Sequence, residues 1–288
     1  MHRTLISASD VLALQAAGGP LVLLDCSFDL TDPGAGERAF TLGHLPGALY
    51  AHLERDLSGT QAAPGAPSLG RHPLPAPDAL AASAGRWGIA PGVQVVAYDA
   101  QGGPYAARAW WLLQWLGHKA VAVLDGGTAA WLAAGGVLRP GLAFLPAAVA
   151  PYPAPSQDIP AMPTVTASEL GAVLGRVPLL DARAAERFRG DAEPLDPVAG
   201  HIPGALNRFF KNNLQADGRF KPVAVLHAEF SALLGDSAAA TVVQQCGSGV
   251  TACHNLLAMT HAGLPGSRLY PGSWSEWCSD PARPVARG

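Results

Sequence analysis

The chain has 288 residues, of which 49% are hydrophobic and 14% are charged, and its formal net charge is −3 at pH 7. This composition can bury substantial cores and excludes a disordered chain. The small net charge favours neither a nucleic-acid partner nor an anionic membrane, and no run of about 18 uncharged apolar residues predicts a membrane span.

Short apolar runs that alternate with helical stretches predict an α/β fold along the whole chain. Helices are expected over residues 106–116 and 253–262, each followed by a glycine. Apolar runs of this length are typical of central strands in a mainly parallel sheet that is flanked by helices. The predicted strands are residues 21–24, 93–97, 121–124, 179–180 and 241–243.

The chain contains an internal duplication. A Gly-His-x-Pro-Gly-Ala block at residues 43–48 recurs at residues 200–205, and the Leu-Leu-Asp of residues 23–25 recurs at residues 179–181. The spacing of about 150 residues is close to half the chain, which indicates a duplicated domain and not a solenoid. The histidine of each block is expected to hold a turn by hydrogen bonding.

A stretch rich in proline and alanine separates the two halves. Proline interrupts helices and strand ladders, so this stretch is expected to be a semi-stiff linker. We therefore predict a first domain over residues 1–142, a linker over residues 143–163 and a second domain over residues 164–288.

Cys246 is the candidate nucleophile. It follows a predicted strand and opens the glycine-bearing loop of residues 247–251, after which a helix is expected. Loop amides and the helix dipole stabilise anions, so a thiol held there would be largely thiolate at neutral pH. The alternative is a buried structural cysteine. In the first half the matching residue is Asp99, which lacks thiol chemistry, so the first domain is expected to be catalytically inactive.

The other cysteines are Cys26, Cys253 and Cys278, and no CxxC pair is present. This pattern predicts neither a disulfide framework nor a zinc site, and we expect no cofactor and no metal. Asp10 interrupts the apolar residues at the N-terminus, which argues against a signal peptide. A reducing, cytoplasmic location is therefore expected.

Taken together, these motifs resemble a two-domain rhodanese-fold sulfurtransferase. The resemblance rests on the repeated histidine blocks, on Leu-Asp-Gly-Gly at residues 124–127, on Pro-Gly-Ser-Trp at residues 271–274 and above all on Cys-Gly-Ser-Gly-Val-Thr-Ala at residues 246–252. It implies tandem rhodanese-like domains. The last string is most similar to the active loop of 3-mercaptopyruvate sulfurtransferases, whereas thiosulfate sulfurtransferases usually carry basic side chains there.

The resemblance implies a covalent relay without a cofactor. Cys246 would take sulfur from a small donor, 3-mercaptopyruvate or thiosulfate, as a persulfide. It would pass the sulfur to cyanide or to a thiol acceptor, with thioredoxin as one candidate. Ser248, His72 and an acid are implied to bring a proton to the leaving group. Glu54 matches the acid, although the family more often has aspartate there, so Asp56 is an alternative.

The resemblance also implies substrate-binding residues. Arg187 matches an arginine that binds the substrate carboxylate as a bidentate fork. The second arginine of the family corresponds here to Asp196, whose charge would repel an anionic donor; Arg189 or Arg208 could replace the missing cation. The loop residues implied to contact the donor are Gly247, Gly249, Val250 and Thr251.

Three other functions are left open by the sequence. A thiosulfate-preferring enzyme on the same fold is left open by Asp196 and opposed by the uncharged residues after Cys246. A protein phosphatase loop needs an arginine six residues after the cysteine, where this chain has Ala252. A non-catalytic sulfur carrier or protein-interaction module is opposed by the intact nucleophile loop.

Overall fold

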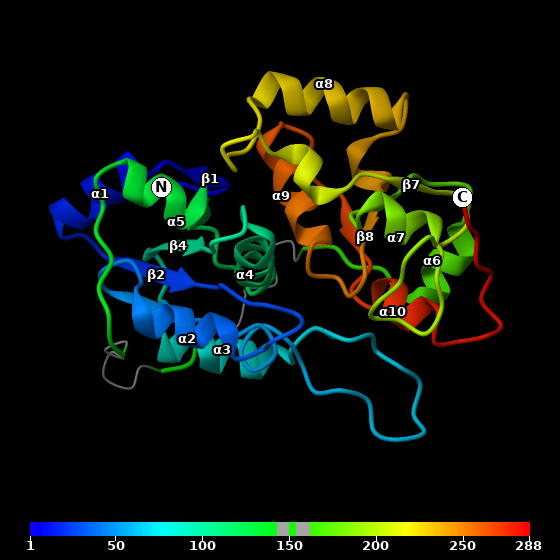
Figure 1. Ribbon diagram of the computed structural model, residues 1–288, viewed down its shortest axis with the longest axis horizontal. Coiled ribbons are helices and arrows are strands. Elements are labelled where there is room, and N and C mark those ends of the chain that lie inside the picture. The colour runs from blue at the N-terminus through cyan, green and yellow to red at the C-terminus, as the bar shows by residue number, and fades with distance from the viewer. Residues whose placement is uncertain (143–149, 154–161) are drawn as a thin grey trace. The chain divides into compact units, whose positions relative to one another are not determined.

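The computed structural model describes residues 1–142, 150–153 and 162–288 (Figure 1). The chain forms two compact units. Unit 1 comprises Met1–Gly59, Pro75–Ala161 and Gln215–Phe220, and unit 2 comprises Thr60–Leu74, Met162–Leu214 and Lys221–Gly288. The predicted linker, residues 143–163, lies largely outside the described residues, and the predicted domain boundaries stay a prediction.

Unit 1 contains a five-stranded parallel sheet with the strand order β1-β5-β4-β2-β3. Its strands are β1 (Leu5–Ile6), β2 (Leu21–Asp25), β3 (Ala48–Tyr50), β4 (Gln94–Tyr98) and β5 (Val121–Leu124). Its helices are α1 (Ala8–Ala17), α2 (Ala35–Leu42), α3 (Pro77–Arg86), α4 (Pro104–Trp115) and α5 (Gly127–Ala133). The almost wholly buried α4 packs against β4 and β5, because both are short runs of apolar residues.

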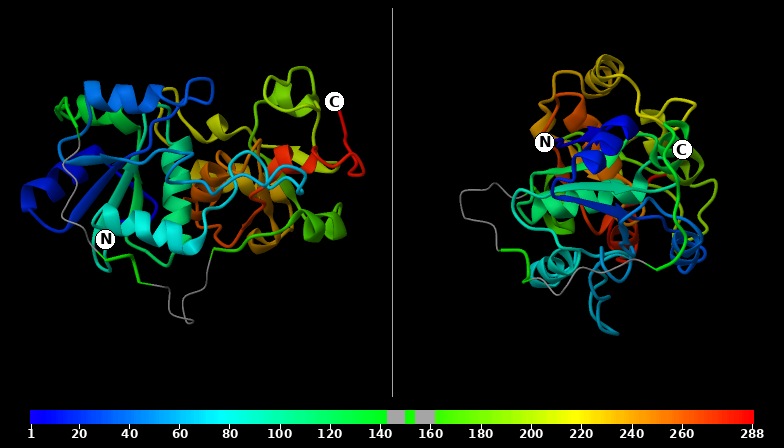
Figure 2. Two further views of the ribbon diagram at one scale, coloured as in Figure 1. Left: turned by 90° about the horizontal axis from the view of Figure 1, so that it is seen from below. Right: turned by 90° about the vertical axis from the view of Figure 1, so that its left-hand side faces the viewer.

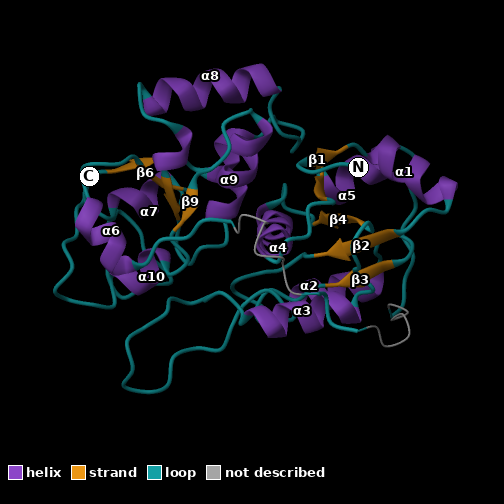
Figure 3. Cartoon of the chain, turned by 180° about the vertical axis from the view of Figure 1, so that it is seen from behind, coloured by secondary structure: helices purple, strands orange, loops and turns teal. Residues whose placement is uncertain are grey.

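Unit 2 contains a four-stranded parallel sheet with the strand order β7-β6-β8-β9. Its strands are β6 (Leu179–Asp181), β7 (Ala205–Asn207), β8 (Val243–Gln245) and β9 (Arg268–Leu269). Its helices are α6 (Ala167–Val173), α7 (Ala185–Arg189), α8 (Val223–Leu234), α9 (Ala252–His261) and α10 (Ser273–Trp277), with 3-10 turns η1 (Phe210–Asn213) and η2 (Ala239–Thr241). In both units helices flank the sheet (Figures 2 and 3).

Each unit has its own hydrophobic core. In unit 1 the core joins Val11 of α1 to Leu23, Val96 and Leu124 of the central strands and to Trp131 of α5. The core of unit 2 is richer in aromatic side chains, which are Phe188, Tyr270, Trp274 and Trp277. Burial of such side chains contributes about 1.5–3 kcal/mol each, so each unit has the core of an independent domain.

The predicted parallel sheets are confirmed, and one strand needs correction. The strand predicted at residues 241–243 lies further along the chain, because Thr241 ends the 3-10 turn η2 and β8 covers Val243–Gln245. Gln244 and Gln245 are fully buried in β8, where their backbones pair with β6. Hydrophobicity alone could not assign two glutamines to a buried strand.

The two Gly-His-x-Pro-Gly-Ala blocks fold alike, and the role predicted for their histidines is confirmed. Nδ1 of His44 lies 2.8 Å from the carbonyl oxygen of Phe40, and the two rings stack at 3.9 Å between centroids. Nδ1 of His201 lies 2.8 Å from the carbonyl oxygen of Phe188, with a stacking distance of 3.8 Å. Both histidines therefore fix a turn against a preceding helix.

Candidate active site

Cys246 lies where β8 ends, at the carboxyl edge of the unit 2 sheet, and its side chain is buried. Its backbone N–H donates to Oγ of Ser273 at 3.1 Å, and its carbonyl oxygen accepts from the N–H of Trp274 at 3.0 Å. The carbonyl oxygen of Gly247 accepts from the N–H of Ser275 at 2.9 Å. These three bonds fasten the start of the loop to α10, so the position of the thiol is well defined.

Gly249 allows the loop to turn back toward α9. Its φ is +76°, a left-handed conformation that favours glycine. A Cβ atom at this position would lie 2.3 Å from the carbonyl oxygen of Pro271, so a larger residue would also clash. The chain then reaches Thr251 and enters α9 at Ala252. The order of strand, thiol, glycine-bearing loop and helix is the one that the sequence predicts.

The matching loop of unit 1 shows which backbone donors this geometry directs at a buried acidic group; they lower the pKa of Asp99, although its burial raises that pKa more. Asp99 is buried directly after β4, and its carboxylate accepts four backbone N–H groups at 2.8–3.0 Å. The donors are Gln101, Gly103, Tyr105 and Ala106. Because the two loops arose from one duplication, the loop after Cys246 is suited to hold a thiolate or a persulfide anion in the same way.

Two amides of the catalytic loop are available for that task. Ser248 and Val250 correspond to Gln101 and Gly103 of the first loop. Among the residues that the structure describes, the backbone N–H groups of Ser248 and Val250 have no hydrogen-bond acceptor. An anionic sulfur on Cys246 would supply one, which is the arrangement found around Asp99.

Ser248 contacts a histidine that is far away in the sequence. Its Oγ lies 2.7 Å from Nδ1 of His72, and both side chains are buried. The two residues are separated by 176 positions in the chain. The structure thus brings two predicted residues, Ser248 and His72, into contact, and Ser248 lies two positions after Cys246 in the chain.

The segment of residues 60–74 belongs to unit 2 and is anchored beside the loop. Gly70 has a φ of +83°, and a Cβ atom there would lie 2.5 Å from the carbonyl oxygen of Gly272, so the two backbones are in close contact. The backbone N–H of Arg71 donates to Oγ of Ser275 at 3.0 Å. These contacts place the side chains of Arg71 and His72 at the catalytic loop.

The candidate acids Glu54 and Asp56 both belong to unit 1. Glu54 is exposed, and its backbone N–H lies 3.2 Å from Nδ1 of His52. Asp56 is buried, accepts the N–H of His52 at 2.9 Å and pairs with Arg86 at 3.4 Å. A role for either acid in the site of unit 2 stays a prediction.

Two arginines, and not only the predicted one, adjoin the loop. Arg187 pairs with Glu193 at 2.6 Å and with Asp196 at 3.4 Å. Asp196 is buried and also forms an ion pair with Arg71. A Cβ atom added at Gly247 would lie 2.8 Å from Nη2 of Arg71 and 3.5 Å from Nη1 of Arg187. Both guanidinium groups therefore converge on the residue that follows the nucleophile.

Arg71 is a site residue that sequence reasoning missed. The signal that could have revealed it is its opposite charge to the unexpected Asp196. The two arginines considered as replacements are engaged elsewhere: the exposed Arg189 pairs with Asp191 at 2.8 Å, and Arg208 pairs with Glu229 at 2.6 Å.

A third arginine, Arg183, is buried near the site. Arg183 is buried, pairs with Asp181 at 2.7 Å and lies 4.8 Å over the ring of Trp274. Burial lowers its pKa, but Asp181, Glu193 and Cys246 attract the positive charge, and the net effect holds the pKa of Arg183 above its ordinary value. Arg183 therefore remains a positively charged group that is buried within unit 2.

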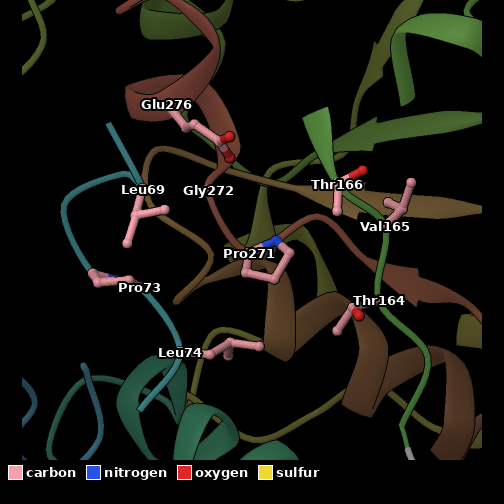
Figure 4. Close-up of a pocket in the computed structure, with 9 residues that line it drawn as sticks. All are labelled: Leu69, Pro73, Leu74, Thr164, Val165, Thr166, Pro271, Gly272 and Glu276. Atoms are coloured by element: carbon pink, nitrogen blue, oxygen red, sulfur yellow. The ribbon is translucent and has the colours of Figure 1, made fainter. Parts of the chain in front are cut away.

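A cavity of about 290 Å³ lies beside the catalytic loop (Figure 4). Its walls are mainly apolar and include Leu74, Val165 and Pro271, with the carboxylate of Glu276 at one side. Gly272 also lines the cavity and precedes Ser273, whose hydroxyl holds the amide of the nucleophile.

Within the described residues, no group of three or more His, Cys, Asp or Glu side chains could hold a metal ion. In that same part of the chain, no helix has the length and apolar character needed to cross a membrane.

Comparison with known proteins identifies the fold of both halves. The Rhodanese-like domain family matches residues 7–134 and again residues 166–280. The chain belongs to the rhodanese family. The expected tandem α/β rhodanese architecture and the resemblance to sulfurtransferases are thereby confirmed.

Relatives of this rhodanese carry sulfurtransferase names. A Pseudomonas aeruginosa protein provisionally named a 3-mercaptopyruvate sulfurtransferase is 51% identical over 96% of each chain. A Mycobacterium tuberculosis protein provisionally named a thiosulfate sulfurtransferase is 42% identical over 99% of this chain and 98% of its own. The solved structure of the 3-mercaptopyruvate sulfurtransferase from Leishmania major is 28% identical in sequence and has a TM-score of 0.78. The match covers 96% of this chain and 74% of the Leishmania major chain.

Proposed function

We propose that this rhodanese is a 3-mercaptopyruvate sulfurtransferase that works through a persulfide on Cys246. The observation that carries the proposal is the contact of His72 with Ser248, two residues after the nucleophile. Such a pair can deliver a proton to a leaving group, and pyruvate leaves 3-mercaptopyruvate as an enolate that needs one. The name of the Pseudomonas aeruginosa relative supports the same donor.

In the first step the thiolate of Cys246 attacks the sulfur of the donor. A sulfur–sulfur bond forms, the carbon–sulfur bond breaks, and its electron pair leaves with the enolate of pyruvate. The proton of the donor thiol is transferred to the enolate carbon, with Ser248 and His72 as the relay. The products are pyruvate and an anionic persulfide, which the loop amides and Arg183 stabilise.

In the second step a thiol acceptor attacks the outer sulfur and releases the thiolate of Cys246. Cyanide would serve as an acceptor in an assay, and thioredoxin is a candidate in the cell. All four cysteines are unpaired in the structure, which supports a reducing compartment such as the cytoplasm. Gly247, Gly249, Val250 and Thr251 would contact the donor as parts of the loop.

Thiosulfate is the alternative donor, and one observation favours it. The Mycobacterium tuberculosis relative carries a thiosulfate sulfurtransferase name. Asp196 places a negative charge next to Arg187, which opposes either anionic donor and does not distinguish between them. The uncharged residues after Cys246 and the His72–Ser248 pair favour 3-mercaptopyruvate, because sulfite leaves thiosulfate without needing a proton.

The deciding experiment compares kcat/KM for 3-mercaptopyruvate and thiosulfate in one preparation, with a thiol acceptor and with cyanide. We expect a preference for 3-mercaptopyruvate with both acceptors, and one additional sulfur atom on the peptide that contains Cys246 after reaction with donor alone. A preference for thiosulfate would select the alternative. No turnover with either donor would leave the sulfur-carrier hypothesis.

A further inference from the structure

Two arginines and one aspartate form a network of ion pairs beside Gly247. Arg71 and Arg187 both approach Gly247, and Asp196 lies between them with one carboxylate oxygen toward each guanidinium. The side chain of Asp196 is only 3% exposed, whereas those of Arg71 and Arg187 are 28% and 18% exposed. The carboxylate is therefore the inner partner, and the two cations keep contact with solvent.

Asp196 depends on Arg71 more than on Arg187. Arg187 already has a strong partner in Glu193, at 2.6 Å through Nη2 and 3.3 Å through Nε, and its contact with Asp196 is long at 3.4 Å. Arg71 forms an ion pair with Asp196. A buried carboxylate needs a cation close by, because desolvation of a charge is costly.

The backbone holds Arg71 firmly while its side chain extends over the loop. Its N–H is fixed to Ser275, and the preceding Gly70 is in close contact with Gly272. The guanidinium then reaches the space that a side chain at Gly247 would occupy, directly after the nucleophile. This space adjoins Cys246 in the chain, so a carboxylate attached two carbons from a sulfur at Cys246 could reach it.

We propose that Arg71 is the second cation that binds the donor carboxylate, and that the carboxylate of Asp196 is a built-in competitor that binds Arg71 and Arg187 until the donor arrives. This inference rests on the proposed function and assigns the carboxylate-binding residues of that site. In this chain the acid stands at residue 196 and the cation comes from residue 71, in the segment that also carries His72.

The proposal has a consequence for donor affinity. A donor carboxylate must displace Asp196 from two arginines, so the acid weakens binding while it keeps the cations in place. Replacing the acid by its neutral isostere removes the competition without removing volume. Arg71→Ala removes the receiving cation, and Arg71→Lys keeps the charge but loses the bidentate fork.

A chemical probe tests this assignment independently of sulfur transfer. Iodoacetate and iodoacetamide both alkylate Cys246 with loss of iodide, but only iodoacetate carries a carboxylate near the reacting carbon. The rates at Cys246 are followed by peptide mass mapping in the full-length protein. Their ratio cancels any change in thiol reactivity or access that both reagents experience, so it reports the cation that receives the carboxylate.

We expect Arg71→Ala to lower the ratio of iodoacetate to iodoacetamide rates about 10- to 100-fold, as for a lost charge-assisted hydrogen bond. Arg71→Lys should lower it less, and Asp196→Asn should raise it severalfold. Arg189→Ala is the matched control, because Arg189 is an exposed cation two residues from Arg187 that pairs with Asp191; its ratio should not change.

An unchanged ratio in Arg71→Ala overturns the assignment, and so does a lowered ratio in Asp196→Asn. The KM for 3-mercaptopyruvate in the same variants separates this inference from the proposed function. If the wild-type protein does not use 3-mercaptopyruvate but the ratio depends on Arg71, the proposed function fails and the cation is correctly assigned. If the wild-type protein turns over 3-mercaptopyruvate normally and the ratio is the same in Arg71→Ala as in the wild type, the proposed function stands and this inference fails.

Discussion

Oγ of Ser248 lies 2.7 Å from Nδ1 of His72, and both residues are buried, each with 4% of its surface exposed. A buried hydroxyl that is bonded to an imidazole can pass a proton in either direction, which an exposed serine on a loop cannot do selectively. Because both residues belong to unit 2, the proposed nucleophile and the proposed proton relay lie within one compact unit.

Replacing either member of this pair should impair one donor more than the other. Ser248→Ala and His72→Ala are each expected to lower kcat with 3-mercaptopyruvate by about 10²–10⁴-fold, the usual contribution of general acid catalysis. With thiosulfate the loss should be small, because sulfite leaves as an anion. The double variant should be no slower than the single ones; equal losses with both donors would contradict a proton relay.

The nucleophile itself can be tested by Cys246→Ser, which should abolish sulfur transfer to all acceptors. Serine keeps the shape of the side chain but lacks a thiolate that could attack sulfur. Cys26→Ala is the control, because Cys26 is a buried cysteine of unit 1 and its loss should leave turnover intact. Full activity in the Cys246→Ser variant would show that Cys246 is not the nucleophile.

Arg187→Ala should raise KM for 3-mercaptopyruvate about 10-fold or more, and should change KM for cyanide little. The variant removes a cation from the donor site and also leaves Glu193 and Asp196 with one partner fewer, which adds repulsion. Steady-state kinetics with varied donor and varied acceptor give both constants. Equal changes in the two would argue against a carboxylate-binding role.

Gly249→Ala should destabilise the protein far more than Gly263→Ala. Both glycines have a left-handed φ, +76° and +79°, so each substitution costs about 1 kcal/mol in backbone strain. At Gly263 a new Cβ atom would meet nothing within 4 Å, whereas at Gly249 it would clash with the carbonyl oxygen of Pro271. Denaturant unfolding measures the difference; similar midpoints would show that the loop can move away.

The carboxyl of Glu276 should make stability depend on pH. Burial raises its pKa above the ordinary value of 4.5, although Tyr270 and Arg283 oppose the shift. A raised pKa means that the folded state binds more protons than the unfolded state between the two pKa values, so stability falls as pH rises through this window. Glu276→Gln should lose this part of the pH dependence, measured as the free energy of unfolding from pH 4 to 8. Parallel curves for both proteins would contradict the shift.

The local features of the catalytic loop were predictable from sequence. Cys246, its glycines and the following helix are consecutive, and short-range rules for left-handed turns and helix starts apply to them directly. The duplication was also readable, because the histidine blocks recur in order. The exact strand was not: the buried pair Gln244 and Gln245 looks polar, and only pairing with β6 makes it β8.

The sequence by itself therefore determined the family and the α/β layout and predicted Cys246 as the nucleophile, since these depend on motifs of neighbouring residues. Tertiary structure alone decided which distant side chains meet beside the loop that follows Cys246. His72 lies 176 positions from Ser248 and Arg71 lies 125 positions from Asp196, and both contacts exist because the segment of residues 60–74 packs within unit 2. No local periodicity encodes that packing, which depends on close backbone contact between Gly70 and Gly272.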